Sequence, residues 1–236
     1  MIKILILGDI HGRTVWKNIL EKEQPQQVIF LGDYVGSHDN IPAQQQIDNL
    51  EAILSLKEER PDDIILLRGN HDLQHLGYWW AECSNLSHKV QNYMATDEYR
   101  QRFLSSTQWI HEFSCGGQKI ICSHAGVSAV WLSNTGIGTV ERINSCKPSE
   151  NFSFRPGRFS DHNGESCTQP CTWIRPKSLA ECAVEGYVHI VGHTPQERVT
   201  HERINDQTEM WLVDALAHGG YLVLEDDEFI IRNLQP

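Results

Sequence analysis

The sequence predicts an α/β fold in which two packed mixed β-sheets are flanked by helices. Three observations support this prediction. Short apolar runs recur along the chain, and each is closely followed by a polar side chain. Helical patterns separate the first three runs, an order typical of parallel strands joined by crossover helices. Short, evenly spaced strand patterns near the end of the chain indicate a second, antiparallel sheet packed on the first.

The first strand is expected at residues 2–7, an apolar run typical of a strand buried on both faces. It leads into Gly8-Asp9-Ile10-His11-Gly12-Arg13. A carboxylate and an imidazole two residues apart leave an extended segment on the same side, so Asp9 and His11 can reach one ion. A helix over about residues 14–23 follows, because its apolar residues recur at helical spacing.

The second strand is expected at residues 27–31, and it also ends in Gly-Asp, with Asp33. An aspartate at this point could bridge two ions. A helix over about residues 41–60 then returns the chain to the sheet, with Pro42 suited to its first turn. The order is β-α-β-α-β once the third strand is added.

The third strand is expected at residues 64–67, and Asn70-His71-Asp72 follows it. Polar residues at the carboxyl ends of strands are where α/β sheets usually place their chemistry. An asparagine oxygen can ligate a cation, and a histidine can donate a proton while a carboxylate holds its other ring nitrogen. Three such residues in a row therefore form a candidate site.

The rest of the chain adds two more histidines at strand ends. A broken helical pattern covers residues 73–113, with aromatic residues expected in the core or in a cap over the sheet. A strand at 118–122 leads to His124, and a strand at 187–191 leads to His193. A short helix is expected at 177–183. Four further short strands are predicted at 198–204, 210–213, 221–224 and 229–232.

The length of 236 residues predicts a single domain over 1–236. Residues 144–172 are rich in Pro, Gly, Ser and Asn, which predicts a loop-rich excursion, because the strand pattern resumes after it. Hydrophobic residues make up 40% of the chain and charged residues 22%, an ordinary globular composition.

The formal net charge of -11 argues against stable nucleic-acid binding, which needs clustered Lys and Arg. It leaves a phosphate substrate possible, because bound cations can reverse the charge of a site. The apolar start is too short for a secretory signal, and no window approaches a membrane span of ~20 apolar residues. A cytoplasmic location with no membrane partner is therefore expected. The seven cysteines favour a reducing compartment. Cys167 and Cys171 could bind a metal, form a disulfide or remain free thiols.

The candidate ligands share one property, which is that each follows a predicted strand. They are Asp9, His11, Asp33, Asn70, His71, His124 and His193. Carboxylate, amide and imidazole side chains with one bridging aspartate are the composition of a two-metal phosphoester site. Such mixed ligands suit two divalent ions of Mn2+, Fe2+ or Zn2+.

The order Gly-Asp-x-His, Gly-Asp, Gly-Asn-His-Asp, Ser-His-Ala-Gly and Gly-His-Thr-Pro resembles the calcineurin-like metallophosphoesterase superfamily. The resemblance extends from Ile6 to about Leu224. Leu66-Leu67-Arg68-Gly69-Asn70-His71 and the later Asp214-Ala215-x-Ala217-x-Gly219-Gly220 are similar to the phosphoprotein phosphatase branch. That branch includes serine/threonine protein phosphatases and symmetrical diadenosine tetraphosphatases.

The resemblance implies a role for each motif residue. Asp9 and His11 would hold the first metal, Asp33 would bridge, and three residues would hold the second: Asn70, His124 and His193. His71 would be the general acid, with Asp72 holding its imidazole. A metal-bound hydroxide would attack phosphorus in line.

One motif departs from the family pattern Gly-Asp-x-x-Asp-Arg-Gly. Here the stretch is Gly32-Asp33-Tyr34-Val35-Gly36-Ser37-His38, so the arginine that grips phosphate is missing. The second phosphate-gripping arginine of the family corresponds to Arg175, in Trp173-Ile174-Arg175. We expect Arg13 or His38 to supply part of the missing contact, which is worth roughly 1.5–3 kcal/mol.

The function predicted is therefore that of a metal-dependent phosphatase acting on phosphomonoesters, whether phosphoprotein or small molecule. Two alternatives remain open. One is hydrolysis of a dinucleoside polyphosphate or another phosphoanhydride or phosphodiester. The other is a scaffold that has lost catalysis, although every expected ligand is present.

Overall fold

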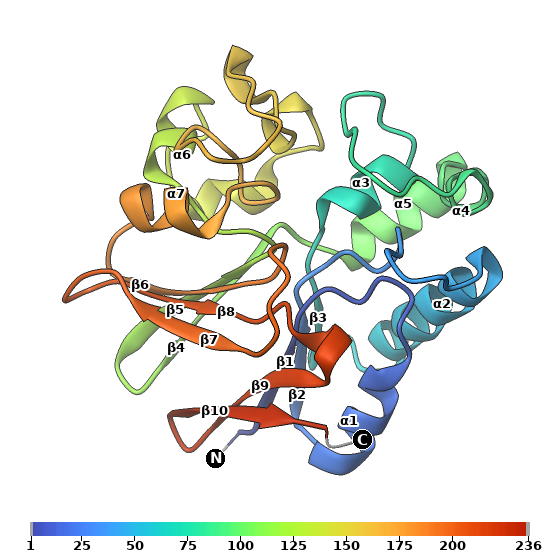
Figure 1. Ribbon diagram of the computed structural model, residues 1–236, viewed down its shortest axis with the longest axis horizontal. Helices are drawn as coiled ribbons and strands as arrows, with labels where there is room; N and C mark the ends of the chain where they lie inside the picture. Colours follow the sequence, from blue (N-terminus) through green and yellow to red (C-terminus); the bar gives the residue numbers. More distant parts are fainter. Residues whose placement is uncertain (1, 235–236) are drawn as a thin grey trace.

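The two sheets of the predicted fold are present in the computed structural model, which describes residues 2–234 (Figure 1). The first sheet has the spatial order β10-β9-β1-β2-β3, with β1 Ile4–Leu7, β2 Gln27–Phe30, β3 Ile64–Leu66, β9 Gly220–Glu225 and β10 Glu228–Asn233. The second has the order β4-β5-β6-β8-β7, with β4 Ile110–Cys115, β5 Gln118–Ser123, β6 Tyr187–Val191, β7 Thr200–Arg203 and β8 Glu209–Leu212. The predicted fold class is confirmed.

The first three strands run parallel, as predicted. Ile4 of β1 pairs with Gln27 of β2, and Val28 of β2 pairs with Ile64 of β3. The crossovers are α1 (Val15–Glu23) and α2 (Ala43–Glu59). Because parallel strands finish at the same edge of a sheet, the loops after β1, β2 and β3 meet there.

The last four strands are divided between the two sheets, so the prediction of one antiparallel C-terminal sheet was wrong. β7 and β8 extend the second sheet, where β8 runs parallel to β6. β9 pairs with β1 in the first sheet instead, with Ile4 opposite Leu224. The reason is burial: β9 is apolar and buried over residues 220–224, which suits a central strand covered on both faces.

Alternate residues of β1 point into two separate cores. Leu5 and Leu7 pack against helices α1 and α2, whereas Ile4 and Ile6 pack against the second sheet. This alternation is the period of two that a strand imposes on its side chains. The first sheet is therefore covered by helices on one face and by the second sheet on the other.

The region after β3 is helical but ends earlier than predicted. It contains α3 (Asn70–His75), α4 (His88–Met94) and α5 (Asp97–Ser106), and the predicted helical stretch to residue 113 includes β4 instead. α6 (Ala129–Asn134) was not predicted, and α7 (Pro176–Cys182) was. Asn70, His71 and Asp72 thus form the first turn of α3 rather than part of a strand-end loop.

Residues 140–158 contain three short 3-10 helices: η1 Val140–Ser145, η2 Glu150–Phe152 and η3 Pro156–Arg158. Phe152 is buried and stacks on Trp109, with the ring centroids 3.7 Å apart. This contact packs the 144–172 excursion onto the body of the protein. The cysteines at 83, 115, 122, 146, 167, 171 and 182 are all free thiols. Each helix within residues 2–234 is too short or too polar to cross a bilayer.

Candidate functional site

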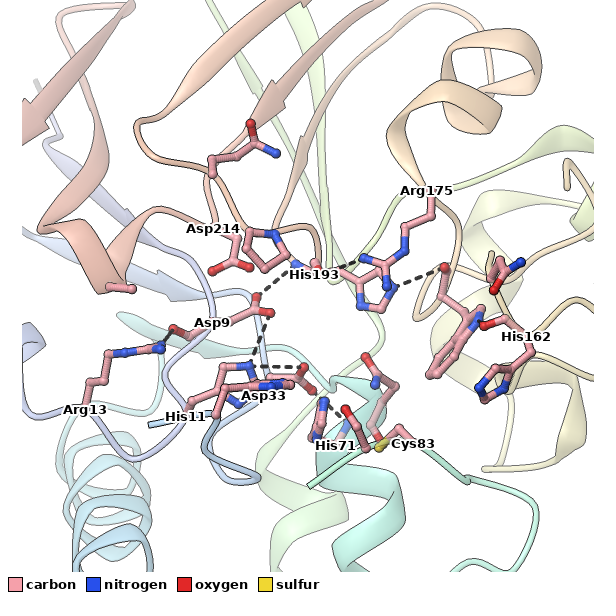
Figure 2. Close-up of a pocket in the computed structure, with 18 of the residues that line it drawn as sticks. Asp9, His11, Arg13, Asp33, His71, Cys83, His162, Arg175, His193 and Asp214 are labelled. Carbon is pink, nitrogen blue, oxygen red and sulfur yellow. Dashed lines mark hydrogen bonds and ion pairs between the residues drawn. The ribbon is translucent and has the colours of Figure 1, made fainter. Parts of the chain in front are cut away.

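The five predicted motifs converge at one edge of the two sheets (Figure 2). Asp9 and His11 follow β1, and Asp33 follows β2. The second sheet supplies His124 directly after β5 and His193 two residues after β6, and α3 supplies Asn70 at its first residue. These side chains are buried, and all of them except His124 line a cavity of about 580 Å³. Segments far apart in the sequence thus present their polar side chains to one space.

Two groups of ligand atoms share Asp33. Asp9, His11 and Asp33 form one group, and Asp33, His124 and His193 form the other. Within each group the ligand atoms lie within 4.8 Å of one another. Since a carboxylate has two oxygens, Asp33 is the residue that could serve both groups.

Three of the histidines present one ring nitrogen to a backbone carbonyl. His11 Nδ1 lies 2.9 Å from the Val35 oxygen, His124 Nδ1 lies 2.8 Å from the Leu31 oxygen, and His193 Nε2 lies 3.1 Å from the Trp173 oxygen. A carbonyl only accepts, so each of these nitrogens carries the hydrogen. The other nitrogen of the neutral ring therefore has a free lone pair, as in metal-bound histidines.

The contact between His124 and Asn70 indicates whether a cation fits between their side chains. His124 Nε2 lies 2.9 Å from Asn70 Oδ1 and 3.4 Å from Asp33 Oδ2. With the hydrogen on Nδ1, all three atoms are acceptors, and only a proton or a cation among them removes the repulsion. Burial lowers the pKa of His124, but the carboxylates of Asp33 and Asp9 raise it further, to about 10. These three atoms therefore fit a divalent ion as ligands. Without an ion, a proton on His124 Nε2 takes its place.

The carboxylates of the site carry an excess of negative charge. Burial and the neighbouring Asp214 raise the pKa of Asp9. Burial also acts to raise the pKa of Asp33, but His124 and His71 more than offset it, so the net shift is downward. Buried carboxylates that raise one another's pKa are stabilised by cations nearby, which again matches a metal site.

The partner expected for His71 is corrected by the structure. Asp72 does not hold the His71 imidazole: its Oδ2 accepts from the N–H groups of Gly69 and Asp33, and its Oδ1 accepts from that of Tyr34, each at 2.9 Å. Among residues 2–234, His71 Nδ1 has no hydrogen-bond partner. It packs instead against Gly36, where an added Cβ would lie 2.5 Å from Nδ1. The Asp72 carboxylate therefore fixes the backbone at the start of α3, because it accepts hydrogen bonds from three buried backbone N–H groups there.

His71 lies in the cavity beside Asp33. Its backbone N–H donates to Asp33 Oδ1 at 2.9 Å. Burial lowers the pKa of the ring to about 3, although Asp33 acts in the opposite direction. The ring is thus neutral at pH 7 and still carries one N–H.

Two glycines allow the aspartates to approach the backbone. A Cβ on Gly69 would lie 2.0 Å from Asp33 Oδ1, and a Cβ on Gly192 would lie 2.4 Å from Asp9 Oδ1. The N–H of His193 donates to that same Asp9 oxygen at 2.9 Å. The glycines of the Gly-Asn-His-Asp and Gly-His-Thr-Pro motifs are therefore required by close contact with Asp33 and Asp9, which are candidate ligands from two other motifs.

Both predicted arginines line the cavity, and they lie on either side of the aspartates (Figure 2). Arg175 Nη1 donates to the His193 oxygen at 3.1 Å and to Thr194 Oγ1 at 3.2 Å. Arg13 Nε donates to Asp39 at 2.9 Å. His38 also lines the cavity, from its exposed rim.

The structure adds residues to the cavity to which no role was assigned. Asp214 follows β8 and faces Asp9 (Figure 2). Its signal was present, because Trp211-Leu212-Val213 is a sixth apolar run before a carboxylate. The excursion contributes His162, Asn163 and Glu165 to the cavity wall. The sequence singled out none of these three residues.

This arrangement has a counterpart among known proteins. The family model described as calcineurin-like phosphoesterase matches residues 2–214. The chain belongs to the calcineurin-like phosphoesterases. The predicted family is confirmed, and membership places this phosphoesterase among hydrolases of phosphoric esters, a family that uses divalent metals.

Two curated relatives agree with the predicted phosphoprotein phosphatase branch. The phosphoesterase is 27% identical over 132 residues to a probable serine/threonine-protein phosphatase of Encephalitozoon cuniculi, covering 53% of this chain and 26% of the relative. It is also 27% identical over 132 residues to serine/threonine-protein phosphatase PP1-delta of Caenorhabditis elegans, covering 53% of this chain and 39% of the relative. The match thus spans well under half the length of these relatives.

Solved structures share the fold. A cold-active protein-tyrosine phosphatase of a psychrophilic Shewanella species has a TM-score of 0.64 at 19% identity, with 100% of this chain and 81% of that chain covered. A serine/threonine phosphatase from Saccharomyces cerevisiae has a TM-score of 0.59 at 17% identity, with 100% and 80% covered. At these identities the likeness concerns the fold alone.

Proposed function

We propose that this phosphoesterase is a dinuclear-metal-dependent phosphatase that hydrolyses phosphomonoesters. The observation that carries the proposal is the pair of ligand groups that share Asp33. Each group combines carboxylate and imidazole ligands, a set that suits Mn2+, Fe2+ or Zn2+.

The residues that would hold the ions follow from these groups. Asp9 and His11 would hold the first ion, and Asp33 would bridge to the second. Asn70, His124 and His193 would complete the second position, since Asn70 Oδ1 faces the free nitrogen of His124. When bound, two such ions activate water as a nucleophile and stabilise negative charge on the phosphoryl oxygens.

The arginines orient the phosphoryl group. Arg175 is fixed by its contacts with His193 and Thr194, so its guanidinium is positioned before substrate arrives. Arg13, which is tied to Asp39, would supply a second contact from the opposite side. Charge-assisted contacts of this kind offset the arginine that the second motif lacks.

His71 donates a proton to the leaving oxygen in this proposal. It lines the same cavity, and its ring would have to take up a second proton beside the anionic phosphate before it could pass one to the leaving oxygen and return to the neutral form. The hydrogen bond from its backbone to Asp33 keeps the ring beside the ligand groups.

The size of the cavity favours a second substrate class as an alternative. At about 580 Å³ it is larger than one phosphate needs, and the excursion adds polar groups to its far wall. A phosphoanhydride such as a dinucleoside polyphosphate could extend toward His162 and Glu165.

The test is hydrolysis of an aryl phosphate monoester with added Mn2+, beside the matching diester and a dinucleoside polyphosphate. Monoester turnover that is lost in Asp33→Asn supports the proposal. Preference for the anhydride would support the alternative substrate. No turnover of any of the three would contradict both and favour a scaffold.

A further inference from the structure

We propose that His11, His38 and His71 form an additional cation site, which binds Zn2+ or Cu2+ in competition with the first proposed metal position. This site goes beyond the proposed function, and its ion binding does not depend on catalysis. Only its effect on turnover rests on the proposed function.

The three imidazoles converge from three segments of the chain. Their ring centroids are 5.2 Å apart for His11 and His38, 5.0 Å for His11 and His71, and 5.5 Å for His38 and His71. One nitrogen from each ring lies within 4.8 Å of the others. If the three rings only packed against one another, their nitrogen atoms would not have to point to a common position.

The surroundings leave the rings free to bind an ion. His71 is 5% exposed, and its Nδ1 is without a hydrogen-bond partner among residues 2–234. His38 lies at the rim, where the side chain of Asn85 contacts its Nδ1. Nitrogens around tetrahedral Zn2+ are about 3.4 Å apart, given Zn–N distances of about 2.0–2.1 Å. The three nitrogens must therefore approach one another by up to about 1.4 Å, and the exposed His38 is free to move toward the other two rings.

His11 cannot serve two ions at once. Its Nδ1 is bonded to the Val35 carbonyl, so a single nitrogen remains, and the group formed with Asp9 and Asp33 uses the same side chain. A carboxylate can bridge two ions through two oxygens, but one imidazole lone pair binds one ion. The two groups therefore compete for His11.

The chemical type of the ligands decides which ion each group prefers. A set of three imidazoles favours Zn2+ and Cu2+ over Mn2+, whereas the group with two carboxylates accepts Mn2+ as well as Fe2+ or Zn2+. Zn2+ at the histidine site would withdraw His11 from the first position and occupy His71. The expected result is inhibition of the Mn2+-loaded protein by Zn2+ or Cu2+.

The experiment measures Zn2+ binding to the full chain by isothermal titration calorimetry, for wild type, His38→Gln and His218→Gln. His218 is the matched control, because it is another exposed histidine that lines the cavity. We expect His38→Gln to weaken one class of Zn2+ site at least tenfold and to leave Mn2+ affinity unchanged. His218→Gln should bind Zn2+ as wild type does.

The same variants are then compared by the ratio of turnover with and without Zn2+. The Zn2+ concentration for half inhibition should rise at least tenfold in His38→Gln only. Wild-type Zn2+ affinity in His38→Gln, or an equal loss in His218→Gln, would overturn the site. Because calorimetry reports binding without turnover, an inactive protein would contradict the proposed function and leave this test intact.

Discussion

The Asp72 carboxylate accepts a hydrogen bond from the backbone N–H of Asp33 at 2.9 Å, and the same oxygen accepts one from Gly69. It thereby joins the loop after β2 to the start of α3. Burial and the nearby Asp33 raise the pKa of Asp72 to about 8. The position of Asp33, which both proposed metal positions share, thus depends on a buried carboxylate that is bonded to backbone N–H groups.

Asp72→Asn is expected to weaken Mn2+ binding. The amide has one acceptor oxygen in place of two, so at least one buried N–H loses its partner, at a cost of about 1–3 kcal/mol in the free energy of unfolding. Asp33 would shift with its loop. Calorimetry measures the Mn2+ affinity, and urea unfolding measures the free energy of unfolding. A drop in kcat with unchanged Mn2+ affinity would restore the original role of Asp72 beside the His71 ring.

Gly69→Ala is expected to disturb the bridging position directly. The added methyl would lie 2.0 Å from Asp33 Oδ1, so the carboxylate or the start of α3 must move. We expect at least a tenfold loss of Mn2+ affinity, because ligand geometry is tightly limited. Gly117→Ala is the control for backbone strain away from the site, since Gly117 has a φ of +79° and its methyl would meet nothing within 4 Å. Equal affinities in the two variants would show that the close contact does not matter.

Arg175→Ala is expected to raise KM by roughly 10- to 150-fold, which corresponds to the loss of about 1.5–3 kcal/mol from a charge-assisted contact. Arg13→Ala should have a smaller effect, because Asp39 already engages its guanidinium. Steady-state kinetics with an aryl phosphate measures both. Arg142→Ala, at an exposed residue outside the cavity, controls for net charge. If Arg13→Ala leaves kcat and KM unaltered, Arg13 does not compensate for the missing arginine.

His189 is expected to make stability depend on pH. It is fully buried in β6, and burial lowers its pKa from 6.5 to about 4. The unfolded chain therefore binds a proton at a higher pH than the folded protein. Above pH 6.5 the ring is neutral in both states. As pH falls from 6.5 toward 4, the unfolded chain is protonated first, so the free energy of unfolding decreases by about 3 kcal/mol in total. Urea unfolding of wild type and His189→Gln between pH 4 and 7.5 tests this. Parallel pH profiles would contradict it.

The strand-end motifs could be predicted from sequence because each depends on local features: a short apolar run and the polar residue after it. Asp9, Asp33 and His124 were placed correctly at the sheet edge for this reason. The partners of Asp72 could not be predicted, since two of its three contacts are with backbone N–H groups 38 and 39 residues away. The pairing of β9 with β1 depends on which strands are covered on both faces, and spacing alone does not determine this.

The central claim is that two ions bind at positions that share Asp33, and metal content tests it most directly. The chain would be dialysed against Mn2+ and the ions bound per chain counted by elemental analysis, for wild type and Asp33→Asn. We predict about two ions per wild-type chain. In Asp33→Asn we predict a clear loss, because both positions lose a negatively charged ligand. Fewer than one ion per wild-type chain, or an unchanged count in Asp33→Asn, would contradict the account.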